Sequence, residues 1–384
     1  MDSCEENGWE IEIMLKILHS VSNMDRAGIE TMLMNYYRHM DRERIQFEFL
    51  ANKPKPGDYD DEVRSMGGQV YVSPGLNPLH YSDYLRFVGG ILQKDKSIKI
   101  VHAHNEAMGV YALNAAKKAG VGVRIAHAHN TRIIRDYKYP LKLFCKQFLP
   151  YSATDLWSCG RDAGIWFFGK KNWEKRGHIL RNAISLDKFA FNESVRAEIR
   201  SAHGFGDKTV IGHVGRLNVQ KNHTRLLDIF AEYVKINPHA VLALIGEGEL
   251  EDRLRAKAAM LGIKDKVYFA GLQSNVNEWY QAFDVFVLPS LFEGLPVVGI
   301  EAQAAGLACL FSDAVTDEVV LSQGARRLSL KAPDSEWATE IDALARAGRR
   351  RSDGVQIARD AGYDIVTEAE RLTKLYLAMS ERQR

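Results

Sequence analysis

The fold is decided by the stretch DVFVLPSLFEGLPVVGIEAQAAGLACLFS, which runs from Asp284 to Ser312. It contains two apolar runs, 285–288 and 308–311, which are typical of buried parallel strands. Between them a short loop leads to Pro296, which suits the first turn of a helix because its missing N–H costs nothing there. That helix is predicted to end at Gly306. The stretch therefore predicts a strand–helix–strand unit of an α/β sheet.

Two carboxylates stand out in this unit, Glu293 in the loop and Glu301 in the helix. Open α/β sheets bind ligands at the edge where this loop lies, and a helix N-terminus there favours an anion. An ionised Glu only accepts hydrogen bonds, so Glu293 suits sugar hydroxyls better than an anion. Glu301 lies eight positions after Glu293, which is roughly 12 Å if helical, a distance that a sugar and a ribose joined by a diphosphate can cover. Taken alone, the pair also fits an ordinary loop residue and a solvated helix position.

Length and composition limit the number of domains, the kinds of partner and the location of the protein. Its 384 residues, 46% of them apolar, suffice for two domains with a core each. The balance of 51 basic against 49 acidic residues argues against nucleic acid as a partner. The cysteines form no C-x-x-C pair, which predicts neither a disulfide framework nor a zinc site. The polar N-terminus and the lack of an apolar run of about 18 residues predict a cytoplasmic protein.

Strands alternate with helices along the first half of the chain. Short apolar runs at 47–51, 69–72, 98–103 and 124–128 are separated by segments with helical periodicity. This alternation predicts a doubly wound parallel sheet.

Two copies of H-A-H-N end neighbouring predicted strands, at 102–105 and 127–130. Histidines at i and i+2 of a strand face the same side, which invites a metal-site interpretation. A zinc site needs three or four ligands, and no nearby Cys or carboxylate supplies the rest. We therefore expect these polar residues to line a cleft and predict no metal.

The string G-R-L-x-x-x-K-N begins at Gly215, where a predicted strand turns into a helix. Arg216 and Lys221 flank this turn and can converge on one diphosphate, since Arg offers a planar fork and Lys a point charge. The later G-E-G-E string is no dinucleotide fingerprint, because Glu251 stands where the third glycine belongs.

The segment 131–150, TRIIRDYKYPLKLFCKQFLP, carries five basic residues and one acidic one among apolar and aromatic side chains. Such a segment can lie on an anionic membrane surface. It can equally be an ordinary amphipathic helix whose Lys and Arg side chains snorkel to water. The sequence leaves both interpretations open.

F-E-G-L-P followed by Glu301, together with G-R-L-x-x-x-K-N, resembles the signature of the retaining glycosyltransferases of family four. The resemblance implies the α/β GT-B fold, in which two Rossmann-like domains face each other across a cleft. It implies an acceptor domain at 11–185, a donor domain at 186–359, and a closing helix within 360–384 that crosses back to the first domain.

The resemblance also implies roles for individual residues. Catalytic roles fall to Glu293, His129 (with His127 as the alternative), Arg216 and Lys221. Donor binding would involve Gly28, Gly215, Arg216, Lys221, Leu272, Val276, Glu293, Gly294, Leu295 and Glu301. The first loop of relatives is rich in glycine, whereas here it is reduced to Ala27-Gly28.

The implied activity is retaining transfer of a hexose from a nucleotide diphosphate sugar, UDP-linked, with the leaving phosphate taking the acceptor's proton. The acceptor would be a saccharide or polyprenyl-linked saccharide of exopolysaccharide or capsule assembly, met at the inner face of the cell membrane. No metal or other cofactor is expected if Arg216 and Lys221 neutralise the diphosphate. A GT-B epimerase acting on a UDP-sugar and a non-catalytic scaffold that binds nucleotide sugar or membrane are the alternatives.

Overall fold

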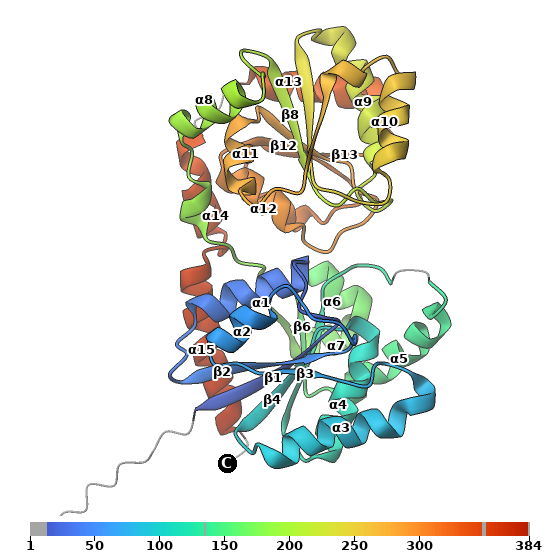
Figure 1. The fold of residues 1–384 in the computed structure, drawn as a ribbon, viewed down its shortest axis with the longest axis vertical. Helices are drawn as coiled ribbons and strands as arrows, with labels where there is room; N and C mark the ends of the chain where they lie inside the picture. The colour runs from blue at the N-terminus through green and yellow to red at the C-terminus, as the bar shows by residue number, and fades with distance from the viewer. Residues whose placement is uncertain (1–13, 134–135, 348–350, 383–384) are drawn as a thin grey trace, which may run out of the picture.

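The computed structural model describes residues 14–133, 136–347 and 351–382, which form two α/β domains stacked along the long axis (Figure 1). The predicted domain limits include residues 11–13 and 383–384, and the predicted membrane segment includes 134–135; all of these lie outside the described residues. Among the described residues, no helix combines the length and apolarity needed to cross a bilayer.

The first domain contains a seven-stranded parallel sheet in the order β3-β2-β1-β4-β5-β6-β7. Its strands are β1 (Leu15–Val21), β2 (Ile45–Ala51), β3 (Val70–Val72), β4 (Ile98–Ala103), β5 (Val123–Ala128), β6 (Asp155–Ser158) and β7 (Gly177–Ile179). Its helices are α1 (Gly28–His39), α2 (Asp60–Ser65), α3 (Tyr81–Lys94), α4 (Val110–Lys118), α5 (Tyr139–Ser152), α6 (Arg161–Phe168) and α7 (Lys170–Arg176).

The second domain contains a six-stranded parallel sheet in the order β10-β9-β8-β11-β12-β13. Its strands are β8 (Thr209–Val214), β9 (Ala240–Ile245), β10 (Val267–Gly271), β11 (Val285–Leu288), β12 (Ala308–Ser312) and β13 (Ala325–Leu328). The helices that follow the first domain are α8 (Glu193–Ala202), α9 (His223–Ile236), α10 (Glu251–Met260), α11 (Val276–Ala282), α12 (Val297–Ala304), α13 (Asp334–Arg346), α14 (Gly354–Asp360) and α15 (Ile365–Glu381).

The stretch 284–312 forms the predicted unit as β11, α12 and β12, with β11 and β12 paired in parallel. Pro296 lies one residue earlier than expected, as the N-cap of α12. Gly306 follows the helix at a φ of 72°, and a Cβ there would lie 2.3 Å from the carbonyl oxygen of Arg351. Only glycine fits both conditions, so the helix ends here as predicted.

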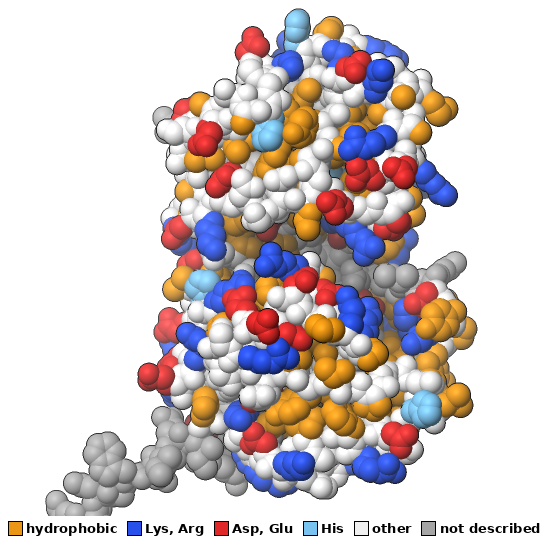
Figure 2. Space-filling model, in the orientation of Figure 1, with side chains coloured by type: hydrophobic (Ala, Val, Ile, Leu, Met, Phe, Trp, Pro, Cys, Tyr) orange, Lys and Arg blue, Asp and Glu red, His pale blue; other side chains and the backbone are white. Residues whose placement is uncertain are grey.

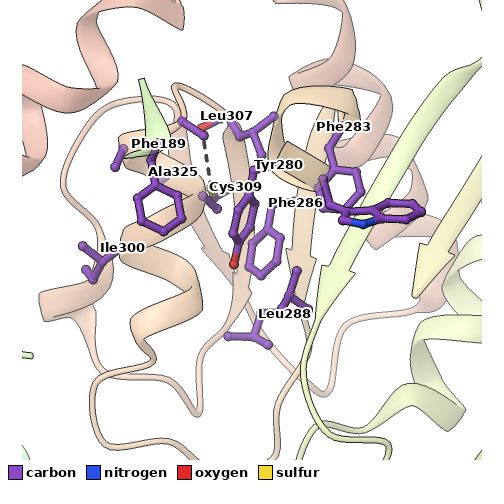
Figure 3. Close-up of a cluster of buried hydrophobic side chains, with 14 of the residues drawn as sticks. Phe189, Tyr280, Phe283, Phe286, Leu288, Ile300, Leu307, Cys309 and Ala325 are labelled. Carbon is purple, nitrogen blue, oxygen red and sulfur yellow. Dashed lines mark hydrogen bonds between the residues drawn. The ribbon is translucent and has the colours of Figure 1, made fainter. Parts of the chain in front are cut away.

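The core beneath this unit is aromatic. The ring of Tyr280 lies between those of Phe189 and Phe286, with centroid distances of 5.9 Å to each (Figure 3). This packing joins α11 and β11 to the short segment that leaves the first domain. The Tyr280 side chain is thereby fixed in place next to α12.

Both sheets reverse their strand order in the middle, at β1/β4 and at β8/β11. Ligands of open α/β sheets bind outside the carboxyl ends of strands at such a point. The carboxyl ends of the two sheets face each other, because Thr131, after β5, donates from Oγ1 to the backbone oxygen of Glu293, after β11, at 2.9 Å. The fold thus places the two expected binding edges on opposite walls of one space.

The chain returns to the first domain at its end, as predicted. Gly362, at a φ of 82°, separates α14 from α15. The N–H of Ile365 bonds to the carbonyl of Ile184 at 3.0 Å, and α15 then packs along α1 (Figure 1). Tyr376 of α15 is fully buried in the core of the first domain. The two domains are therefore linked twice.

Candidate functional site

A cavity of about 380 Å³ lies between the carboxyl edges of the two sheets. The molecular surface is hollowed between the two domains on the face shown in Figure 2. The first domain contributes the stretch 27–30 with His129, Asn130 and Asn182; the second contributes Gln220, Lys221, Glu293 and the stretch 295–298. Its size and position are those of a small-molecule site.

Glu293 is only 7% exposed, and its carboxylate is held by three donors. Oε1 accepts from Lys221 Nζ at 2.8 Å and from Ser290 Oγ at 2.9 Å, and Oε2 accepts from Gln220 Nε2 at 3.2 Å. One cation and two neutral donors fix the orientation of this carboxylate at the cavity wall. The interpretation of Glu293 as an ordinary loop residue does not fit this burial.

Gly294 allows the two domains to approach closely at the site. A Cβ at this position would lie 2.1 Å from the backbone oxygen of His129, a distance that no side chain can occupy. Leu295, 5% exposed, then lines the cavity just before α12 begins. The glycine therefore brings the N-terminus of α12 and its free N–H groups to the cavity.

Glu301 is the second carboxylate of the unit, and it is not solvated either. The hydroxyl of Tyr280 donates to its Oε2 at 2.9 Å. Burial raises the pKa of Glu301 to about 7, with the Tyr280 hydrogen bond acting in the opposite direction. Glu301 lies one turn beyond Val297 and Val298, which line the cavity, and so on the same side of α12. The carboxyl group is therefore placed behind the cavity wall and poised to change charge near neutral pH.

The two expected diphosphate ligands lie in different surroundings. Lys221 lines the cavity and pairs with Glu293, and a Cβ on Gly215 would lie 3.0 Å from the Lys221 side chain. The Arg216 side chain is 72% exposed and pairs with Glu249 at 3.3 Å. The structure thus brings Lys221 and Glu293 together and leaves Arg216 in solvent, outside the set of cavity-lining residues.

The remaining donor candidates lie around the site. Gly28 is the first residue of α1 and lines the cavity, and a Cβ there would meet nothing within 4 Å. Leu272 follows β10 and is 75% exposed, and Val276, half-buried, begins α11. These two residues do not line the cavity of the free protein.

Five histidines at the end of the first sheet are at most 9% exposed: His19, His102, His104, His127 and His129. Their ring nitrogens pair in two chains, His129 to His104 to His19 at 3.0 Å per link, and His127 to His102 at 3.1 Å. Burial lowers the pKa of both His19 and His129 to about 3, so both rings are neutral at pH 7.

The expectation that both H-A-H-N copies line a cleft is wrong in part. His129 and Asn130 line the cavity, whereas His127 and His102 lie in the core and contact each other and Trp157. His127 and His129 project to the same side, with ring centroids 4.0 Å apart, but β5 ends at Ala128, so His129 and Asn130 lie beyond the strand end at the cavity while His127 lies within the strand. Of the two histidine candidates, the structure places His129 at the site.

Ring nitrogens gather in two groups of three, His19 with His102 and His104, and His104 with His127 and His129, each within 4.8 Å. The nitrogens closest to one another are those already paired by hydrogen bonds. Neutral imidazoles satisfy such links in pairs, one nitrogen donating and the other accepting.

Several residues at the site could not be selected from the sequence. Gln220, Ser290 and Tyr280 hold the two carboxylates, and Glu30 and Asn182 line the cavity. A signal existed only for Gln220 and Ser290, which adjoin Lys221 and the end of β11. The others reach the site through tertiary packing.

Family models match both domains. The model described as Glycosyl transferases group 1 matches residues 195–360, and that described as Glycosyltransferase Family 4 matches residues 26–158. EpsF of Bacillus subtilis (strain 168), a protein named as a glycosyltransferase, is 37% identical over 374 residues, covering 96% of this chain and 97% of EpsF. The Escherichia coli UDP-Gal:alpha-D-GlcNAc-diphosphoundecaprenol alpha-1,3-galactosyltransferase is 26% identical, covering 78% of this chain and 79% of that protein.

Solved structures show the same architecture. Anabaena Alr3699/HepE, in complex with UDP-glucose, matches with a TM-score of 0.79 at 18% identity, covering 95% of this chain and 100% of that chain. WaaG, a glycosyltransferase involved in lipopolysaccharide biosynthesis, matches with a TM-score of 0.69 at 13% identity, covering 94% of this chain and 99% of that chain. The two Rossmann-like domains and the returning helix are the GT-B fold. Together with the family models and the similarity to EpsF, these findings show that the chain belongs to the glycosyltransferases that join a family 4 domain to a group 1 domain.

Proposed function

We propose that this glycosyltransferase moves a hexose from a UDP-sugar to a saccharide, with retention at the anomeric carbon. The observation that carries the proposal is the pairing of Lys221 with Glu293 inside the interdomain cavity. A cation and a carboxylate side by side match a ligand whose diphosphate adjoins a polyol. The UDP-Gal in the name of the E. coli relative and the UDP-glucose bound by the Anabaena protein support a UDP-linked donor.

In this proposal the second domain holds the donor. Lys221 and the N–H groups at the start of α12 bind the diphosphate, and Arg216 turns from Glu249 to join them. Glu301 binds the ribose hydroxyls, and the base lies near Leu272 and Val276 beyond the end of β10.

The transferred sugar is bound from both walls. Glu293 accepts hydrogen bonds from its hydroxyls, and His129 contacts it from the first domain with a neutral ring. Gly28 leaves open space beside the diphosphate. As the bond from the anomeric carbon to the diphosphate breaks and the bond to the acceptor oxygen forms on the same face, Lys221 and Arg216 stabilise the charge on the leaving UDP. With these two cations present, the reaction is proposed to need no metal.

The acceptor is proposed to be a saccharide or a polyprenyl-linked saccharide of exopolysaccharide or capsule assembly, bound by the first domain. The support comes from names: the E. coli relative acts on a diphosphoundecaprenol-linked sugar, and a 24% identical Staphylococcus aureus relative, CapH, is a capsular polysaccharide biosynthesis glycosyltransferase.

The first domain also offers a surface for an anionic membrane. On α5 the side chains of Phe144, Phe148 and Tyr151 are 63%, 48% and 77% exposed. Lys138 precedes the helix, and hydrophobic and cationic side chains show together at this edge of the lower domain (Figure 2). Exposed rings beside cations fit an anionic bilayer, at whose inner face the enzyme would meet a polyprenyl-linked acceptor.

The proposal is tested by adding UDP-glucose, UDP-galactose and UDP-N-acetylglucosamine to the protein and to a Lys221→Ala variant. We expect one of them to raise the melting temperature of the unaltered protein by mass action and to release UDP slowly, and the variant to lose both effects. Conversion to an isomeric UDP-sugar would indicate the epimerase alternative instead. Binding without any turnover would indicate the scaffold.

A further inference from the structure

His129 reaches the cavity at the end of a chain of hydrogen-bonded histidines that runs sideways across the first sheet. Nε2 of His129 pairs with Nδ1 of His104 at 3.0 Å, and Nε2 of His104 pairs with Nδ1 of His19 at 3.0 Å. His129 and His104 directly follow β5 and β4, and His19 lies in β1, which is the next strand of the sheet. The chain thus connects the ring at the cavity to the interior of the first domain.

The middle ring of this chain is firmly held. His104 is 2% exposed, and its backbone N–H donates to the carbonyl of Ser20 at 2.8 Å. Its ring lies against that of His102, with centroids 4.1 Å apart. A side chain that is locked by packing and by hydrogen bonds can hold a neighbour in one orientation. His104 therefore restrains the ring of His129 from the side that faces away from the cavity.

The inner end of the chain sets the direction in which its hydrogen bonds run. Nε2 of His19 is fully enclosed, and within the described part of the chain it has no hydrogen-bond partner. Because buried donors are left unpaired less often than buried acceptors, this nitrogen is assigned the lone pair and Nδ1 the proton. Burial lowers the pKa of His19 to about 3 and the pKa of His104 well below its ordinary value, so each ring carries one proton at pH 7. His19 then donates to His104, and His104 donates to His129.

This direction leaves the single ring proton of His129 on Nδ1. Among the described residues that nitrogen has no hydrogen-bond partner, and it is not one of the fully enclosed nitrogens. Since His129 lines the cavity, its Nδ1–H is a donor that a ligand can reach. Glu293 on the opposite wall can only accept hydrogen bonds. A sugar between the two walls would accept at one hydroxyl and donate from another.

We infer that His104 is a positioning residue of the reaction, which holds the His129 ring so that its Nδ1–H points at a hydroxyl oxygen of the transferred sugar. This rests on the proposed function, in which His129 contacts that sugar. His104 itself stays behind the cavity wall and acts only through His129. The second chain, in which His102 bonds to His127 and to Tyr376, does not include His129 and is assigned no such role.

The position of the ring proton can be measured without any sugar. Protein labelled with ¹⁵N in its histidine rings is observed by long-range ¹H–¹⁵N correlation at pH 7.5, and the signals of His129 are assigned by their loss in His129→Gln. We expect its Nδ1 to be protonated and its Nε2 to be unprotonated. A proton on Nε2, alone or in addition, would overturn the inference. So would a metal ion that purifies with the protein on these rings, because coordination would replace the hydrogen bonds.

Substitutions at position 104 test the positioning itself. The amide nitrogen of asparagine lies as many bonds from Cα as Nδ1 of histidine, so His104→Asn keeps a donor beside Nε2 of His129. In His104→Gln the amide takes the place of Nε2 instead, and in His104→Phe no donor remains. We expect the last two variants to lower kcat for the release of UDP from UDP-glucose and UDP-galactose about 10-fold, because a misplaced contact is costly. His104→Asn should retain most of the rate, and UDP affinity, measured by calorimetry, should be unchanged in all three.

His102→Phe is the matched control, because His102 is also fully buried and lies two residues earlier on the same strand but outside the chain. It should lower the melting temperature and leave kcat nearly unaltered. A rate in His104→Asn or His102→Phe as low as in His104→Gln would show a merely structural role and overturn the inference. An unaltered rate in His104→Phe would do the same.

Failure of the unaltered protein to bind UDP or to hydrolyse either donor would overturn the proposed function, and the role of His104 with it. The spectrum separates the two failures, because the position of the ring proton does not depend on turnover. It also needs no substitution at position 104, so the inference can be refuted even if those variants do not fold.

Discussion

The Nζ of Lys221 lies 2.8 Å from Oε1 of Glu293, so the cation proposed to bind the diphosphate is paired in the free protein with the carboxylate proposed to bind the sugar. Both groups are largely buried, with side chains 16% and 9% exposed. A bound donor would have to share or replace this contact, and the two parts of the donor site are therefore coupled.

Glu293→Gln should lower kcat by roughly 100- to 1000-fold, because the group contacts the sugar where charge develops as the bond breaks. UDP affinity should be kept or increased, since Lys221 would lose its partner and be free for the diphosphate. Donor kinetics and UDP calorimetry measure the two effects. Weakened UDP binding with unchanged kcat would contradict the assignment of Glu293 to the sugar.

Glu301→Gln should weaken UDP by about 1–3 kcal/mol, because a buried acceptor for the ribose is lost, while kcat changes little. Since burial raises the pKa of Glu301 to about 7, its carboxylate is protonated below that pH and ionised above it. UDP affinity of the unaltered protein should therefore rise from pH 6 to pH 8. Calorimetry across this range should show a smaller rise in the variant, where only UDP and the other groups titrate. Equal rises in both proteins would exclude Glu301 as the titrating group.

Acid should destabilise the first domain through its buried histidines. In the fold the pKa of His19 and His129 is about 3, against an ordinary value of 6.5, so the unfolded chain binds more protons between these values. Stability is therefore fully present above pH 6.5 and falls below it, by about 3 kcal/mol for the two groups at pH 5.5.

The melting temperature can be followed by tryptophan fluorescence, to which Trp157, with its ring 4.9 Å from that of His102, contributes. We expect the melting temperature to fall steeply as the pH is lowered from 7.5 to 5.5. In His19→Phe the fall should be shallower, whatever the stability of that variant at pH 7.5. A melting temperature independent of pH would show that these rings are not buried in the neutral form.

Chelation should leave activity intact. Lys221 and Arg216 supply the positive charge that a divalent ion would otherwise bring to the diphosphate. UDP release from the donor should be the same before and after treatment with EDTA. Activity that is lost on chelation and restored by Mg²⁺ or Mn²⁺ would refute the metal-free reaction, and restoration by Zn²⁺ would direct attention to the clustered histidines.

Vesicles test the surface of α5. The amount of protein that sediments with anionic vesicles should fall when the salt concentration is raised. It should also fall in the double variant Phe144→Ser/Phe148→Ser. Lys138→Glu should also weaken binding; it is a cleaner change than at Lys142 or Lys146, which bond to Asp136 and to the backbone of Trp166. Met260→Ser, at an 87% exposed position of the second domain, is the matched control. Equal sedimentation of all variants would rule out this surface.

The architecture could be predicted from local patterns. Apolar runs bounded by glycine and proline marked the strands, and the 284–312 stretch formed the expected β11, α12 and β12. The break at Gly362 separated the last two helices as expected. Such signals are carried by neighbours in the chain, so they survive without knowledge of the tertiary structure.

The site could be predicted only where one residue type at one spacing was decisive. The sequence by itself determined the α/β class, the crossing helix, the family resemblance, and the candidates Glu293, Glu301 and Lys221. It placed His129 ahead of His127 only through the resemblance, because the choice depends on where β5 ends relative to the cavity. It could not show that Lys221 pairs with Glu293, or that Glu30 and Tyr280 belong to the site. These residues are separated by long stretches of chain and meet only when two sheets bring their carboxyl edges together, and burial, which sets the pKa of Glu30 and Glu301, arises only from that packing.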